Sequence, residues 1–312
     1  MRTLAIAIFL AAACGLPADG QDVLPLWPEG EMPNSQGLSV QDSVSNDRFY
    51  RVGTPGLYAF FPSDEENVGS AVVICPSGGY DHLTYILGGT QLAKWFNTLG
   101  MSAFVLKYRL PNSPDLKNRA VGPLQDAQRA MRLVRARAEE WGIDPNRVGV
   151  FGSSSGGHLA STLATHPEDA SAIGDSLDEE PFAPDFLMLV SPVITMKSFT
   201  HEGSRTNLLG ENPSPEQVDA YSNETRVTAD TPPTFLVHAA NDEAVDPRNS
   251  IAFYRALLAH GVTAGLHVFP RGGHAIALRG NPGTTEQWTA LGEGWLDAQG
   301  LLTPSPRASR SR

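Results

Sequence analysis

The chain has 312 residues and a formal net charge of −11, and its Lys and Arg residues are scattered rather than clustered. The basic patch of a nucleic-acid-binding protein is therefore absent, and the acidic balance favours solubility and neutral or cationic ligands. A chain of this length can bury one large core, and no linker, composition shift or internal repeat divides it.

Residues 1–20 predict a secretory signal peptide. One Arg precedes an apolar run from Leu4 to Ala13, which is shorter than the roughly 20 apolar residues of a membrane span. The small residues that follow place cleavage after Gly20. The alternative is a lipoprotein signal with Cys14 lipidated, for which Ala11 is a poor match. Either signal predicts export to the periplasm or out of the cell. No membrane association is expected beyond a lipid anchor at Cys14 in the lipoprotein alternative.

Residues 21–300 are expected to form a single domain, followed by a disordered tail at 301–312 that is rich in Ser, Pro and Arg. Cleavage after Gly20 leaves Cys75 as the only cysteine, which excludes an intramolecular disulfide and a Cys-based metal cluster. Cys75 ends an apolar run, which favours a buried structural thiol over a reactive one.

Apolar runs alternate with helical patterns along the chain, which predicts an α/β fold with a mostly parallel, doubly wound sheet flanked by helices. In such sheets ligands bind beyond the carboxyl ends of the strands. Strands are expected at 71–75, 102–108, 147–151, 185–190, 234–238 and 266–269, helices at 89–100, 123–142, 155–166 and 246–261, and proline-rich loops at 179–186 and 211–218.

The stretch "RVGVFGSSSGGHLAST" has three consecutive serines between a predicted strand and a predicted helix. The pattern G-x-S-x-G fits in one way, with Gly152 and Gly156 as its glycines, and strand, turn and helix are the context of a nucleophile elbow. Ser154 is then at the apex of a tight turn that small neighbours permit. The alternative is a flexible Gly/Ser turn.

A serine hydroxyl becomes nucleophilic when an adjacent base, oriented by an acid, removes its proton. In this fold the expected chain order is Ser, then Asp or Glu, then His. His274 follows the last predicted strand in a Gly-rich loop and is the candidate base. Asp242, the first carboxylate after the preceding strand, is the candidate acid in competition with Glu243 and Asp246. Asp246 precedes Pro247 and is expected to cap the following helix.

The other histidines after Ser154 are weaker candidates. His158 follows Ser154 by four residues within the predicted helix, while His238 and His267 lie in predicted strands. For His274 and Asp242 the alternatives are an ordinary loop histidine and a turn aspartate.

The oxyanion of the transition state needs two backbone N–H donors, one after the nucleophile and one from an earlier loop. Ser155 is expected to supply the first, and Gly78 and Gly79 leave the backbone uncovered for the second, with a plain turn as the alternative. Tyr80 is a candidate to stack on a sugar or an aromatic acyl group, with core packing as an equal alternative. The signals together predict a serine hydrolase that needs no metal or cofactor.

Two charged residues of the long predicted helix, Asp126 and Arg129, are expected to form a structural ion pair or cap. The neighbouring Tyr108 and Arg109 are expected to be structural as well.

Segments such as "VVICPSGGY", "VFGSSSGGHLAST", "PPTFLVHAANDEAVDPRNS" and "LHVFPRGGHAIAL" resemble bacterial α/β-hydrolase esterases of the acetylxylan and feruloyl esterase type, the BD-FAE-like enzymes. The resemblance covers most of the chain after residue 20. It implies the same roles for Ser154, Asp242 and His274, and hydrolysis of O-acetyl or hydroxycinnamoyl groups on plant or algal polysaccharide fragments. The expected partner is therefore an acylated carbohydrate or another small ester.

The chain departs from these relatives at two places. Ser77 stands where relatives usually have a glycine, and Gly88 stands where they commonly have an acidic residue before a glycine. The first departure is expected to leave the oxyanion site intact, and the second bears on the pocket wall and on substrate choice.

Three rival functions make different demands on the sequence. A short-chain carboxylesterase or lipase uses the same triad, and a lipase needs an apolar lid that is not found. A prolyl-peptidase relative needs a further large domain. A non-catalytic binding protein on the hydrolase fold predicts a missing triad member, and all three are present.

Overall fold

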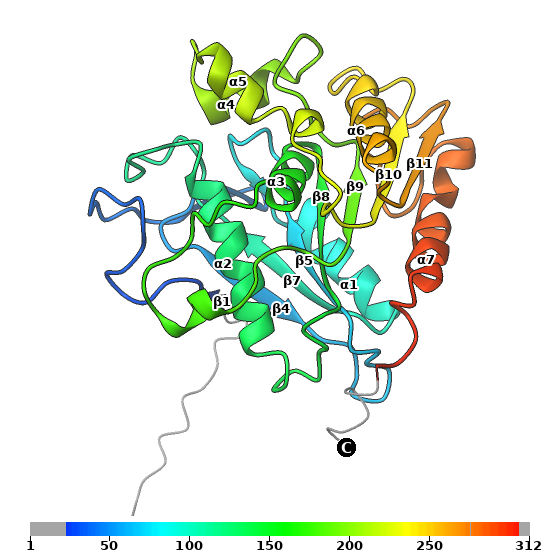
Figure 1. Ribbon diagram of the computed structural model, residues 1–312, viewed down its shortest axis with the longest axis horizontal. Helices are drawn as coiled ribbons and strands as arrows, with labels where there is room; N and C mark the ends of the chain where they lie inside the picture. Colours follow the sequence, from blue (N-terminus) through cyan, green and yellow to red (C-terminus); the bar gives the residue numbers. More distant parts are fainter. Residues whose placement is uncertain (1–22, 275, 306–312) are drawn as a thin grey trace, which may run out of the picture.

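The computed structural model describes residues 23–274 and 276–305 (Figure 1). The predicted signal peptide with Cys14 and the end of the predicted tail lie outside the described residues. Within the described ranges, no helix combines the length and apolar character that a membrane span requires.

The centre of the molecule is an eight-stranded sheet with the order β1-β4-β7-β5-β8-β9-β10-β11. β4 pairs antiparallel with both β1 and β7, and every other neighbouring pair is parallel. This arrangement confirms the mostly parallel sheet. The strands are β1 (Val23–Pro25), β4 (Gly56–Phe60), β5 (Ala71–Cys75), β7 (Ser102–Lys107), β8 (Val148–Ser153), β9 (Leu187–Val190), β10 (Thr234–Ala239) and β11 (Ala264–Phe269).

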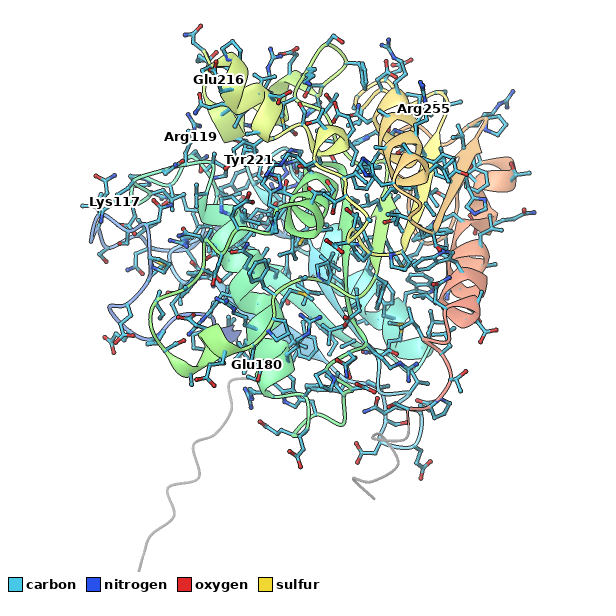
Figure 2. The ribbon with its side chains drawn as sticks, in the orientation of Figure 1. Lys117, Arg119, Glu180, Glu216, Tyr221 and Arg255 are labelled. Atoms are coloured by element: carbon cyan, nitrogen blue, oxygen red, sulfur yellow. The ribbon has the colours of Figure 1, made fainter. Side chains whose placement is uncertain are left out.

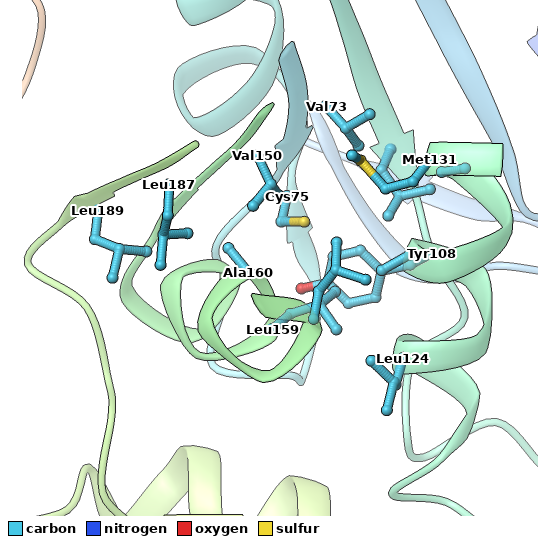
Figure 3. Packing of buried hydrophobic residues seen from close by; sticks show 14 of the residues in the cluster. Val73, Cys75, Tyr108, Leu124, Met131, Val150, Leu159, Ala160, Leu187 and Leu189 are labelled. Carbon is cyan, nitrogen blue, oxygen red and sulfur yellow. The ribbon is translucent and has the colours of Figure 1, made fainter. Parts of the chain in front are cut away.

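Helices cover both faces of the sheet (Figure 1). On one face lie α2 (Gly122–Ala136), α3 (Ser154–Thr165) and α6 (Arg248–Ala259), and on the other lie α1 (Gln91–Thr98) and α7 (Trp288–Ala298). Because both sides of the parallel strands are covered, these strands are mostly apolar on both faces rather than alternating. Two hydrophobic cores result, the first between the sheet and α2, α3 and α6, and the second between the sheet and α1 and α7. Figure 3 shows the first core, where Val73 and Val150 of the sheet face Leu159 of α3 and Met131 of α2.

Cys75 lies in this first core and is fully buried. Burial raises the pKa of its thiol, so the side chain stays protonated and packs as a small apolar group. The prediction of a structural thiol is confirmed.

Smaller elements surround the sheet. A second sheet has the strand order β2-β3-β6, and two short helices follow β9. These elements are β2 (Ser43–Ser45), β3 (Arg48–Arg51), β6 (Leu83–Thr84), a π-helical turn (Ile86–Thr90), α4 (Glu202–Leu209), α5 (Pro215–Ala220) and three 3₁₀ segments (Ser176–Glu179, Asn223–Thr225 and Gly283–Gln287).

Two sequence predictions of secondary structure are wrong. The stretch 211–218 was expected to be a loop, but its second half begins α5, where Ser214 accepts the N–H of Gln217 and Gln217 accepts the N–H of Ser214. This capping box starts a helix, and Pro215 fits at its first position because the N–H that proline lacks would be unpaired there. The helix expected over 123–142 ends at Ala136, and the chain then turns so that Trp141 packs on Phe104, with ring centroids 4.9 Å apart.

A buried polar cluster attaches the N-terminal segment to α2. Asp126 accepts hydrogen bonds from Trp27 Nε1 (2.8 Å), from the backbone N–H of Arg109 (2.8 Å) and from the Arg109 guanidinium (2.8 Å). Arg129 instead pairs with Asp175 and donates to the Leu26 carbonyl. The expected pairing of Asp126 with Arg129 is therefore wrong, because each reaches a partner outside the helix, although both residues are structural as expected.

Replacing Asp126 tests how much this cluster stabilises the fold. Asp126→Asn leaves the buried Arg109 guanidinium without its counter-charge, which is expected to lower the free energy of unfolding by about 3 kcal/mol. Urea denaturation monitored by circular dichroism measures the change. The matched control is Glu140→Gln, which removes an exposed pair with Arg137 and is expected to leave the midpoint near that of the wild type. Equal midpoints for both variants would contradict the role given to Asp126.

Candidate active site

The turn between β8 and α3 holds Ser154 in a left-handed backbone conformation, with φ of 53°. The two flanking glycines are required by close contacts. A Cβ at Gly152 would lie 2.2 Å from the carbonyl oxygen of Gly156, and a Cβ at Gly156 would lie 2.1 Å from the carbonyl oxygen of Cys75. The chain therefore turns sharply enough to present the serine at the carboxyl end of β8, as the G-x-S-x-G pattern predicts.

Three side chains meet at this end of the sheet. His274 Nε2 lies 2.9 Å from Ser154 Oγ, and His274 Nδ1 lies 2.8 Å from Asp242 Oδ2. The Nδ1–H donates to the carboxylate, which leaves Nε2 as the acceptor for the serine hydroxyl. The three residues selected from the sequence are thus brought into one hydrogen-bonded chain.

Asp242 is a buried carboxylate with donors on both oxygens. Oδ1 accepts the N–H groups of Ala244 (3.0 Å) and Val245 (2.9 Å), and Oδ2 faces both His274 and His238. Burial alone raises the pKa of Asp242, but the hydrogen bonds from His238, His274 and Val245 outweigh it and hold the pKa well below its usual range. The carboxyl group is therefore ionised at neutral pH.

The competing carboxylates do not reach His274. Glu243 is exposed, and Asp246 accepts the N–H of Arg248 (2.9 Å) and pairs with its guanidinium at the start of α6. Asp246 thus acts at the helix terminus, as expected from its place before Pro247.

His238 is a site residue that the sequence interpretation missed. It is fully buried in β10, its Nε2 lies 3.0 Å from the Val245 carbonyl oxygen and 3.2 Å from Asp242 Oδ2, and its Nδ1 lies 2.7 Å from Ser250 Oγ. Nε2–H is the donor and Nδ1 accepts the serine hydroxyl. The sequence feature that could have identified His238 is a titratable residue inside an otherwise apolar predicted strand.

Gly78 and Gly79 form the turn after β5, with φ of 132° and 64°. A Cβ at Gly78 would lie 1.9 Å from the His82 carbonyl oxygen, so this position requires glycine, whereas a Cβ at Gly79 would meet only Cε1 of His201, at 3.9 Å. Across the residues that the structure describes, the backbone N–H groups of Gly78, Gly79 and Ser155 have no protein acceptor. Their expected role as donors to an anionic oxygen stays a prediction.

Tyr80 does not have the place expected of a substrate contact. Its side chain is 1 % exposed, and its hydroxyl lies 2.9 Å from His158 Nδ1. His158 Nε2 donates to the carbonyl of Tyr221, the residue after α5 labelled in Figure 2, so Nδ1 accepts the Tyr80 hydroxyl. Burial raises the pKa of Tyr80 well above its usual value. Of the two alternatives given for Tyr80, stacking on a substrate is therefore wrong and core packing is confirmed, because the ring is buried and bonded to His158.

The two departures from the family pattern are neighbours. Ser77 Oγ lies 2.6 Å from Thr84 Oγ1, and a Cβ at Gly88 would lie 2.4 Å from Thr84 Oγ1 and 3.2 Å from Ser77 Oγ. With Ser77 and Thr84 in place, a side chain at position 88 does not fit without a shift. The two departures are therefore one local change in packing beside the Gly78–Gly79 turn.

The described part of the chain holds no group of three or more His, Cys, Asp or Glu side chains arranged to bind a metal ion.

Comparisons with known proteins find similar sequences and similar solved structures. The family model BD-FAE matches residues 60–257. The chain is 33% identical over 231 residues to an acetylxylan esterase of Xylanibacter ruminicola, covering 72% of this chain and 44% of that protein. It is 33% identical over 226 residues to endo-1,4-beta-xylanase B of Butyrivibrio fibrisolvens, covering 72% of this chain and 35% of that protein. The chain thus spans less than half the length of these curated relatives.

Among solved structures, the acetyl ester-xyloside bifunctional hydrolase from Caldicellulosiruptor lactoaceticus is similar over nearly the whole described fold. The TM-score is 0.78 at 36% sequence identity, with 90% of this chain and 97% of that chain covered.

His158 gives the site region a measurable pH dependence of stability. Burial lowers the pKa of His158 to about 4, below the value of about 6.5 in an unfolded chain. Between these two values the unfolded chain binds more protons, so stability falls as the pH decreases. From pH 7 to pH 5 the contribution is about 2 kcal/mol.

His158→Gln is expected to remove this contribution, because Gln does not titrate and its amide can still donate to the Tyr221 carbonyl. The loss of unfolding free energy from pH 7 to pH 5 is then smaller in the variant by about 2 kcal/mol, as measured by urea denaturation at both pH values. Parallel losses in the two proteins would show that His158 does not titrate as described.

Proposed function

Because the chain belongs to the BD-FAE family, we propose that it is a serine esterase that removes O-acetyl groups from hemicellulose-type carbohydrates. The observation that carries the proposal is the hydrogen-bonded chain from Ser154 through His274 to Asp242. The names of the 33%-identical relative, an acetylxylan esterase, and of the solved acetyl ester-xyloside hydrolase support the acetylated sugar as substrate. Hydroxycinnamoyl esters are the second acyl class considered.

In the proposed reaction Ser154 Oγ attacks the ester carbonyl carbon while His274 Nε2 takes the hydroxyl proton. The N–H groups of Gly79 and Ser155 hold the negative oxygen of the tetrahedral intermediate. When the bond to the sugar oxygen breaks, His274 returns the proton to that oxygen, and an acyl group remains on Ser154. Water, activated by His274, then releases acetate and restores the serine. Asp242, already ionised, fixes the tautomer of His274 and stabilises its cationic form.

We also propose that the protein is exported. The support is the sequence of residues 1–20, with its apolar run and the small residues that end it. An exported enzyme meets polymeric hemicellulose outside the cytoplasm, in agreement with the proposed substrate.

The proposed function is tested by acetate release from acetylated xylo-oligosaccharides, measured beside p-nitrophenyl acetate and methyl ferulate. The wild type is expected to release acetate from the oligosaccharides. Ser154→Ala removes the nucleophile, so its rate is expected to fall by about 10⁴-fold or more. Hydrolysis of the small esters alone would contradict the carbohydrate substrate and favour a short-chain carboxylesterase. An active Ser154→Ala variant would contradict the assignment of the nucleophile.

His238 is expected to position Asp242, and it therefore affects every ester alike. His238→Asn keeps an acceptor near the place of Nδ1 but has no donor at the place of Nε2. The loss of this donor to a buried carboxylate is expected to lower kcat about tenfold on both sugar and p-nitrophenyl acetates.

His238→Gln is the matched control, because its amide nitrogen can occupy the place of Nε2 and is expected to restore most of the activity. Equal activity of the two variants would show that the bond from His238 to Asp242 has no part in catalysis.

A further inference from the structure

Helix α4 is fastened to the turn that contains Gly79. Asn207 Nδ2 donates to the Gly79 carbonyl (2.9 Å), and Arg119, labelled in Figure 2, donates from Nη2 to the Asn207 carbonyl (2.7 Å). At the other end of the helix, His201 is the N-cap residue. The atom nearest to a Cβ built on Gly79 is Cε1 of His201, at 3.9 Å. The imidazole therefore stands over the open side of Gly79.

The hydrogen bonds of His201 fix which ring nitrogen carries the proton. Nδ1 accepts the backbone N–H of Ser204 (3.2 Å) and lies 2.8 Å from Ser204 Oγ. The proton of the neutral ring is therefore on Nε2, which has no hydrogen-bond partner among the residues that the structure describes. Partial burial and the nearby His274 lower the pKa of His201, so the ring is neutral at pH 7.

The chemistry of the reaction decides which part of the ester lies beside His201. The leaving alcohol oxygen receives its proton from His274 Nε2, so the alcohol part must lie on the His274 side of Ser154. His201 follows Phe199 and Thr200, which line the same cavity as Asp242, the hydrogen-bond partner of His274.

A cavity of about 450 Å³ lies against the two residues that immediately precede His201 in the chain. Its walls are Phe199 and Thr200 and, from the loop after β10, Ala240, Asp242, Glu243, Ala244, Asp246 and Pro247. An aromatic ring and an exposed carboxylate, that of Glu243, are among its lining groups. Such a mixture of one apolar face and hydrogen-bonding groups suits a sugar ring with several hydroxyls.

We propose that His201 is a substrate-contacting residue whose Nε2–H binds a sugar oxygen next to the ester, and that the cavity between Phe199–Thr200 and residues 240–247 receives the sugar. The inference rests on the proposed function and deepens it, because it assigns the recognition of the alcohol part to α4 and this cavity. The acyl part and the chemical step do not depend on His201.

Two variants separate the donor from the helix cap. His201→Asn keeps an oxygen that accepts the Ser204 N–H, and Asn is a good N-cap residue, but it has no donor at the place of Nε2. His201→Gln places an amide N–H near Nε2. On acetylated xylo-oligosaccharides, kcat/KM is expected to fall about tenfold in His201→Asn and to be largely retained in His201→Gln. On p-nitrophenyl acetate, which has no sugar, both variants are expected to match the wild type.

Melting temperatures of the two variants show whether α4 is intact. An equal loss of activity on both esters in His201→Asn would overturn the inference, since His201 would then act on the Gly79 turn or on the chemistry. Unchanged activity on the oligosaccharides would overturn it as well. A wild type that hydrolyses p-nitrophenyl acetate but no acetylated sugar would instead refute the proposed function, and the two failures are thereby distinct.

Discussion

Ser154 keeps a backbone conformation that a residue with a side chain rarely adopts, and the surrounding chain holds it there. Such a conformation costs about 1–3 kcal/mol and persists where neighbouring structure over-determines it. Here the helix packs directly on the sheet, because Gly156 touches the Cys75 carbonyl, and the Val193 N–H donates to the Ser154 carbonyl (2.9 Å). The two large cores on either side of β8 fix the positions of these contacts. The placement of the serine is thus a consequence of packing throughout the sheet.

The second constraint is electrostatic. A carboxylate that is removed from water is destabilised unless donors replace the lost hydration. Asp242 obtains donors from His274, from His238 in β10, and from the backbone N–H groups of Ala244 and Val245. Because three different segments converge on one carboxylate, the contacts that keep it ionised also hold the loop of His274 against the sheet.

The sequence predicted the parts of the molecule that follow from local pattern. The parallel strands were recognisable because burial on both faces makes them mostly apolar. Ser154 was recognisable because steric contacts require glycine two residues before it and two residues after it. Side-chain direction and long-range partners were not available. Tyr80 is adjacent to Gly79 in sequence, but its ring is directed to His158 in the core. Asp126 meets Arg109 across segments whose relative placement no spacing rule gives.

Helix α4 contacts the Gly79 turn through residues at both of its ends. Asn207, near its C-terminal end, holds the carbonyl of Gly79, while His201, at its N-terminal end, stands over the same glycine. The peptide of Gly79 and the imidazole of His201 therefore keep a fixed separation as long as the helix is intact. In the proposed reaction, a sugar held at His201 is consequently held at a set distance from the donors of the oxyanion. Binding energy from the sugar, which takes no part in the bond changes, is in this way used to orient the ester carbonyl for attack by Ser154.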